Sequence, residues 1–257
     1  MEFLKQVELS LQDIFALAWF LAAWGCYSVI IQTGGRDRQP LSRLMDLERL
    51  LWMHQCARRE VRIFDSQIII GLGQGAAFFA STSLLALGGA LTLFQNAEMA
   101  AKLFSNLPLN SNSSLLLWEI KTLGLVVIFA FCFFKFGWSY RLFNYTSILM
   151  GAMPTADEIE TQRGRAAVYR AGRMMTNAGR HFNAGQRGLF LSIGYMCWYF
   201  GPGPFVIGTS LVIGVLVRRQ FFSEAREASL IKKDEIDQLE WPDELEGKRS
   251  DDFPLSQ

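Results

Sequence analysis

The chain has 257 residues, of which 51% are hydrophobic and 13% aromatic, and its formal net charge is +1. This composition is too apolar for an ordinary soluble domain, and the near-neutral total hides a strong segregation of charge along the chain. A bilayer core of about 30 Å requires roughly 20 mostly apolar residues in a helix. Four segments meet or approach this need, near 11–32, 67–94, 114–138 and 188–217. The sequence therefore predicts an all-α integral membrane helical bundle.

The first segment resembles a cleaved signal only superficially. A single lysine precedes it, and its apolar run continues past Cys26 to Ile31, which favours a retained helix. Ser10 and Asp13 have the spacing of a capping box, so we expect the helix to start there. The four cysteines show no paired spacing, and we expect neither disulfides nor a metal site.

A second helix is predicted from Pro40 to Asp65, on the cytoplasmic side and running directly into the second membrane segment. Within that segment, small residues at steps of three and four residues share one helical face, which favours close helix packing and suggests a homo-oligomer. These residues are Gly73, Ala76, Ala80 and Ser83.

Four polar side chains lie in or beside the membrane segments. Charges at membrane depth are expensive, so a polar path for a solute or ion is one hypothesis. Trp118 and Trp138 lie close to three of them, which favours the alternative of anchoring at the two interfaces, and an interhelical hydrogen bond is the simplest role for the fourth. The four are Gln74, Glu119, Lys121 and Lys135.

The stretch 162–187 repeats Ala-Gly-Arg at 171–173 and 178–180. Residues seven apart return to nearly the same helical face, so five arginines share one side: Arg163, Arg170, Arg173, Arg180 and Arg187. Small residues, Gly172 and Gly179 among them, allow another helix to approach. We expect a cytoplasmic helix continuous with the last membrane segment. Its arginines would contact anionic lipid or an anion-attracting vestibule; pairing with acidic neighbours or solvation is the alternative.

The last segment contains the run Gly201, Pro202, Gly203 and Pro204, which cannot continue a regular helix. The arginines of 32–66 and 139–187 predict that both connections are cytoplasmic. Four simple passes would then leave the C-terminus outside, yet Arg218 and Arg219 follow the last segment at once. A hairpin of two half-helices, which we favour, removes this conflict; one long kinked crossing is the alternative.

No phosphate-binding loop, metal-ligand cluster or nucleophile motif is present in the sequence, and the two histidines are far apart along the chain. We therefore expect no enzyme activity, no cofactor and no nucleic-acid partner.

Several short motifs, in this order, resemble a family of multi-pass membrane proteins of bacteria and plants known as a domain of unknown function. The resemblance covers roughly residues 10 to 222 and implies a bacterial inner-membrane location, but it assigns no site roles. The motifs are Arg62-Ile-Phe-Asp65, Phe78-Phe-Ala-Ser-Thr82, Leu117-Trp-Glu-Ile-Lys121, Phe134-Lys-Phe-Gly-Trp138 with Arg141 and Asn144-Tyr145, Gly179-Arg-His-Phe-Asn-Ala-Gly185 with Arg187, and Arg218-Arg-Gln-Phe221.

We thus expect a membrane helical domain at 1–222 and a charged tail at 223–257. Two functions remain open. The first is a pore or transporter subunit for a small solute or ion, which the broken helix and the intramembrane charges suggest. The second is a non-catalytic scaffold that binds anionic lipid or a protein partner through the arginine-rich bundle. A lipid-active enzyme would require a converging acid and base at the interface.

Overall fold

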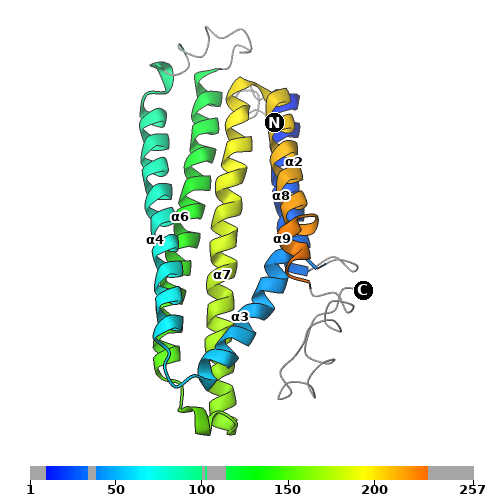
Figure 1. The fold of residues 1–257 in the computed structure, drawn as a ribbon. Coiled ribbons are helices and arrows are strands. Elements are labelled where there is room, and N and C mark those ends of the chain that lie inside the picture. The colour runs from blue at the N-terminus through cyan, green and yellow to red at the C-terminus, as the bar shows by residue number, and fades with distance from the viewer. Residues whose placement is uncertain (1–9, 34–38, 100–101, 103–113, 231–257) are drawn as a thin grey trace.

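A computed structural model describes residues 10–33, 39–99, 102 and 114–230, and within these ranges every regular element is helical (Figure 1). The six long helices are α2 (Leu11–Thr33), α3 (Leu41–Arg58), α4 (Ile63–Gln95), α6 (Leu115–Gly151), α7 (Gln162–Met196) and α8 (Pro202–Phe221). The short elements are η1 (Ala156–Glu158), η2 (Cys197–Phe200) and α9 (Glu224–Glu227). The predicted all-α class is confirmed.

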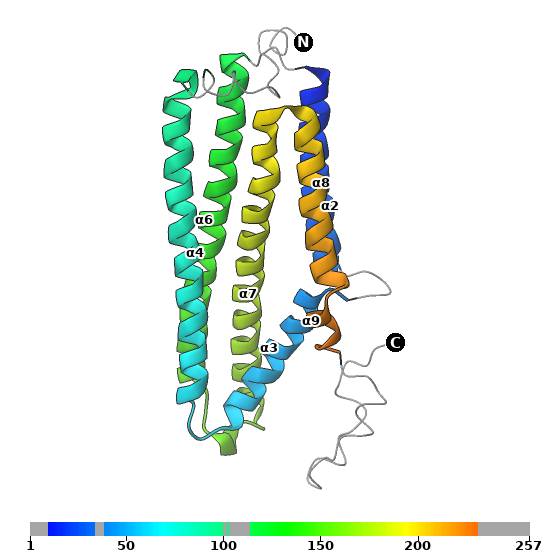
Figure 2. The same cartoon turned by 45° about the horizontal axis from the view of Figure 1, so that its top comes forward.

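Helix length divides the molecule into two halves. At 1.5 Å per residue, α2 and α8 extend for about 30 to 35 Å, which matches a bilayer core, whereas α4, α6 and α7 extend for about 50 to 55 Å. The long helices run beside α2 and α8 in one half and beside the oblique α3 in the other (Figures 1 and 2). We call these the membrane half and the basic half.

Four helices are long and apolar enough to cross a membrane, with spans at Leu11–Ile31, Ile63–Gln95, Leu115–Gly151 and Pro202–Glu227. Large apolar side chains on these helices point outward, as lipid contact requires: Leu85 is 78% exposed and Phe134 is 71% exposed. The predicted first three segments are thus confirmed. The fourth is divided between two helices.

The last apolar segment is a hairpin. Helix α7 ends at Met196, η2 follows, and Gly201 turns the chain with φ of 119° before α8 begins at Pro202. A proline suits the first turn of a helix because its missing N–H has no partner there. Helix α8 then runs back beside α7 (Figure 2). The return places Arg218 and Arg219 toward the basic half, which removes the conflict in the charge pattern.

The predicted continuous helix from Pro40 to Asp65 is wrong, because α3 ends at Arg58 and α4 begins at Ile63. The Arg62 guanidinium explains the break: it donates to the carbonyl oxygens of Ala57 at 3.0 Å and Pro154 at 2.9 Å. These bonds satisfy carbonyls near the ends of α3 and α6, so the turn depends on tertiary contacts.

Small residues allow close packing within the chain. An added Cβ on Gly172 would lie 2.8 Å from Leu50 Cδ2, and one on Gly179 would lie 2.5 Å from Arg49 Cζ, so both glycines admit α3. On α4, the stripe that begins at Gly73 and includes Ala76, Ala80 and Ser83 is buried. The side chains nearest to Gly73 are Phe143 and Tyr140 of α6. The stripe therefore packs inside the protomer and gives no support to an oligomer interface.

Candidate functional site

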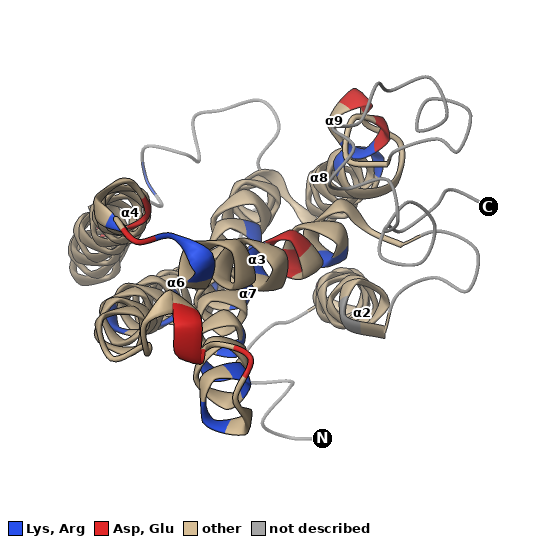
Figure 3. Cartoon of the chain, turned by 60° about the horizontal axis from the view of Figure 1, so that its bottom comes forward, with Lys and Arg blue, Asp and Glu red and all other residues tan. Residues whose placement is uncertain are grey.

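A polar cavity of about 410 Å³ opens where the membrane half meets the basic half. One side is bounded by Ile31, the last residue of the apolar span of α2. The cavity therefore lies at the level where the lipid headgroups begin. Figure 3, with the bottom of the molecule turned forward, marks positions of charged residues on the ribbons of α3 and α7 and on the neighbouring turns. The volume is within the usual range for a ligand site.

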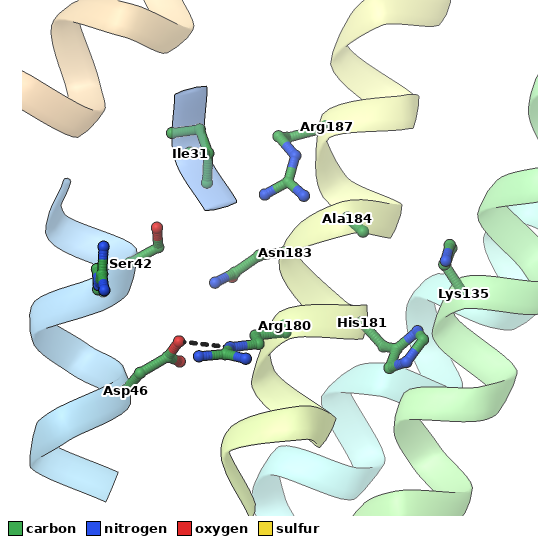
Figure 4. Close-up of a pocket in the computed structure, with 10 residues that line it drawn as sticks. Ile31, Ser42, Asp46, Lys135, Arg180, His181, Asn183, Ala184 and Arg187 are labelled. Carbon is green, nitrogen blue, oxygen red and sulfur yellow. Dashed lines mark hydrogen bonds and ion pairs between the residues drawn. The ribbon is translucent and has the colours of Figure 1, made fainter. Parts of the chain in front are cut away.

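One side of the cavity faces α2 and α3. Arg180, Asn183 and Arg187 extend from α7 toward these helices (Figure 4). Arg180 Nε donates to Asp46 Oδ2 at 2.7 Å, and Arg49 Nη1 donates to Asp46 Oδ1 at 2.8 Å. Both oxygens of the carboxylate are thus occupied by guanidinium groups.

Arg187 differs from Arg180. It is half-buried, and within the described part of the chain it forms no hydrogen bond and no ion pair with a carboxylate. Arg43 adds a third guanidinium to this side and donates to the carbonyl oxygen of Thr33 at 2.9 Å. This side of the cavity therefore carries a clear excess of positive charge.

On the other side of the cavity, between α7 and α6, Lys135 of α6 lies near His181 of α7 (Figure 4). The Lys135 ammonium is 5.3 Å from the centroid of the Phe131 ring. Burial lowers the pKa of His181, and the positive charge of Lys135 lowers it further. His181 is therefore neutral at pH 7. The small side chain of Ala184 lies between the two sides, so the cavity continues across α7.

The predicted arginine face of α7 is confirmed as a face, but not as a single lipid-contacting surface. Arg163, Arg170 and Arg173 are exposed along the part of α7 that lies in the basic half. At 1.5 Å per residue they are about 36, 26 and 21 Å along the helix from Arg187. A headgroup layer is only about 5 to 8 Å thick. Only Arg180 and Arg187 lie near the membrane boundary.

The four predicted intramembrane polar residues are not brought together. Gln74 is exposed on α4, and Glu119 lines an open depression at the end of α4 and α6. Lys135 lines the basic cavity. Lys121 is 1% exposed, so its predicted role as an interfacial anchor is wrong.

Lys121 belongs to a buried polar cluster at the opposite end of the membrane half. Its ammonium lies 5.6 Å from the centroid of the Trp198 ring and near the charge of Asp13. Asp13 accepts hydrogen bonds from Trp198 Nε1 at 2.8 Å and from Ser10 Oγ at 2.6 Å. Asp13 N donates to Ser10 Oγ at 3.1 Å, so the capping pair at the start of α2 is confirmed. The cluster joins α2, α6 and the hairpin turn.

An apolar layer separates this cluster from the basic cavity. It contains Leu125 and Ile128 of α6 and Leu191 of α7, each no more than 5% exposed. None of the three cavities beside Arg187, Glu119 and Pro202 is lined by residues of both polar regions.

Several cavity residues were not anticipated from the sequence as site residues, namely Ser42, Arg43, His181 and Asn183. Asn183 had a usable signal, because it lies three residues after Arg180 and four before Arg187 on one helical face. Ser42 and Arg43 had none, since their approach to α7 depends on the turn at Arg62. The ion pair of Asp46 with Arg180 agrees with the predicted alternative, in which the arginines pair with acidic neighbours.

The cavity does not bring an acid and a base together. Asp46 and His181 lie on opposite sides of α7, and both Asp46 oxygens accept from arginines. Within the described ranges, no group of three or more histidine, cysteine, aspartate or glutamate side chains has a metal-binding arrangement. The geometry suits the binding of an anion by fixed cations.

The fold and the cavity together define a multi-pass, all-α integral membrane protein with a basic cavity at the edge of its apolar spans. The model of a family described as "Protein of unknown function, DUF599" matches residues 15–225, and the chain belongs to this family. The search of curated proteins gave no match, and the search of solved structures gave none.

Proposed function

We propose that this protein is a non-catalytic membrane scaffold that binds anionic lipid headgroups from the cytoplasmic leaflet in the basic cavity. The main support is the position of Arg187, a half-buried guanidinium that has no carboxylate partner among the described residues and lies at the level where the apolar span of α2 ends. A phosphate held there would supply the missing negative charge and accept charge-assisted hydrogen bonds.

The orientation follows from charge. Positively charged loops remain on the cytoplasmic side of bacterial inner membranes, and the basic half carries the arginines of α3, of the first part of α7 and of the end of α8. The cytoplasmic leaflet also holds the anionic lipids, which attract basic side chains by about 1 kcal/mol each. We therefore place the protein in a bacterial inner membrane with its basic half inside.

A pore or transporter subunit is less well supported. Conduction requires a polar route, whereas the cluster around Lys121 and the basic cavity are separated by the apolar layer that contains Ile128 and Leu191. The stripe at Gly73 was the reason to expect a homo-oligomer. It packs against α6 of the same chain, so it no longer supports that expectation. A protein partner, if the scaffold binds one, would contact the exposed arginines that lie too far along α7 to reach lipid headgroups. These are Arg163, Arg170 and Arg173.

The test is ligand-induced stabilisation of the purified full-length protein in detergent. A ligand that binds the folded state raises the unfolding temperature as its concentration rises. Phosphatidylglycerol should raise the unfolding temperature more than phosphatidylcholine does, and Arg187→Gln should remove most of that difference. Arg163→Gln, which removes the same charge far from the cavity, should not. Equal stabilisation by both lipids, or an equal response of both variants, would contradict the proposal.

A further inference from the structure

The cavity has two cationic sides rather than one. Arg180 and Arg187 of α7 face α2 and α3, whereas Lys135 extends from α6 on the other side of α7, and Ala184 leaves open space between them (Figure 4). An α-helix with its side chains is about 10 Å across. Arg187 and Lys135 are therefore too far apart across α7 to converge on one small anion.

Each of the two sides also carries a positive charge that no nearby acid of the described ranges neutralises. Asp46 is the carboxylate of the cavity, and it already accepts from Arg49 and Arg180. Neither Arg187 nor Lys135 has an ion pair with an acid among the residues that the structure describes. Two separated positive charges are best matched by two separated single negative charges.

We propose that the cavity binds one lipid that carries two phosphodiester groups, of the diphosphatidylglycerol type. One phosphate is held by Arg180, Asn183 and Arg187, and the second is held by Lys135 across Ala184. This inference rests on the proposed function and names the lipid class for the same site.

The surroundings fit such a lipid. Ile31 borders the cavity on one side of α7, and on the other side the Phe131 ring lies 5.3 Å from the Lys135 ammonium. Acyl chains from both phosphates thus have apolar surface beside them. Linking two phosphates in one molecule makes the second contact intramolecular, so the pair binds more tightly than two separate single-phosphate lipids.

Native mass spectrometry of the purified full-length protein can measure this preference. The protein is titrated with diphosphatidylglycerol and with phosphatidylglycerol at matched phosphate concentration. We expect one diphosphatidylglycerol per chain, bound on the order of tenfold more tightly than phosphatidylglycerol. Lys135→Gln should weaken diphosphatidylglycerol binding about fivefold, which corresponds to the loss of one cation near the headgroups. It should leave phosphatidylglycerol binding to the arginine side nearly unchanged.

Two controls separate the possible failures. Arg163→Gln loses the same charge on α7 but should bind both lipids normally, and thermal unfolding of each variant verifies its fold. If both anionic lipids bind equally per phosphate and Arg187→Gln weakens both, the two-phosphate inference is wrong while the proposed function stands. If neither binds better than phosphatidylcholine, both are wrong. The deacylated headgroup in tenfold excess should not displace the lipid; displacement would assign the site to a soluble bisphosphate and overturn the lipid assignment.

Discussion

The indole N–H of Trp198 donates a hydrogen bond of 2.8 Å to the carboxylate of Asp13, which ties the turn of the last hairpin to the start of the first helix. The two residues are 185 positions apart. Lys121 lies over the same indole ring, so three distant parts of the chain meet at one buried polar cluster. This contact fixes the end of the bundle opposite the basic cavity.

Removing the charge of Asp13 should destabilise the protein strongly. In Asp13→Asn, the buried ammonium of Lys121 loses the negative charge near it, and a buried charge that is left uncompensated costs about 3 kcal/mol or more. Thermal unfolding in detergent should show a clear loss in this variant. The double variant Asp13→Asn with Lys121→Met should lose less than the sum of the two single changes, because no unpaired charge remains. Strict additivity would show that the two residues do not interact.

The hairpin turn depends on glycine at position 201. Its φ of 119° and ψ of 170° lie in a region almost restricted to glycine. Gly201→Ala should therefore cost about 1 to 3 kcal/mol. Gly203 is the matched control, since it lies inside α8 and nothing stands within 4 Å of an added Cβ. Gly203→Ala should leave the unfolding temperature unchanged or slightly higher, and an equal loss in both variants would contradict the assigned turn.

The stability of the protein should fall as the medium becomes acidic, in part through His181. Burial and Lys135 lower the pKa of this imidazole in the folded state, while the unfolded state keeps the ordinary value near 6.5. The unfolded state then binds the extra proton first, so stability falls as the pH drops below about 6.5 and is unaffected between pH 7 and 8. A comparison of the parent protein with His181→Gln isolates this imidazole, because both proteins keep the other charged groups around the cavity: Arg180, Arg187 and Asp46.

Unfolding temperatures of the parent protein and of His181→Gln between pH 5 and 8 measure this effect. The variant should lose less stability on acidification than the parent does. Identical pH profiles would mean that His181 is free to take up a proton in the folded protein.

The two ends of the described chain should lie on opposite sides of the membrane. The hairpin brings the end of α8 toward the basic half, whereas the start of α2 lies beside the hairpin turn. In a background free of the four native cysteines, Ser10→Cys should react with an impermeant thiol reagent added to intact cells. Ser229→Cys should react only after the membrane is opened. Labelling of both from the same side would contradict the hairpin.

The amphipathy of α7 and the break at Gly201 were predictable, because each follows from local rules of helical periodicity and backbone geometry. The end of α3 and the burial of Lys121 were not. The first depends on Arg62 reaching Pro154, and the second depends on Asp13, over a hundred residues away. Charge near a membrane segment indicates cost, but only tertiary structure identifies the group that offsets it. The cavity could not be predicted either, because it forms only where residues of α2, α3, α6 and α7 come together in the tertiary structure.

Photo-crosslinking reports whether anionic lipid occupies the basic cavity. The full-length protein is placed in bilayers that contain phosphatidylglycerol with a photoreactive group in its headgroup, and the crosslinked peptides are mapped. We expect the adducts to concentrate between Arg180 and Arg187 and to decrease in Arg187→Gln. Few adducts should form between Arg163 and Arg173. Adducts concentrated between Arg163 and Arg173, or spread evenly along α7, would contradict a lipid site in the cavity.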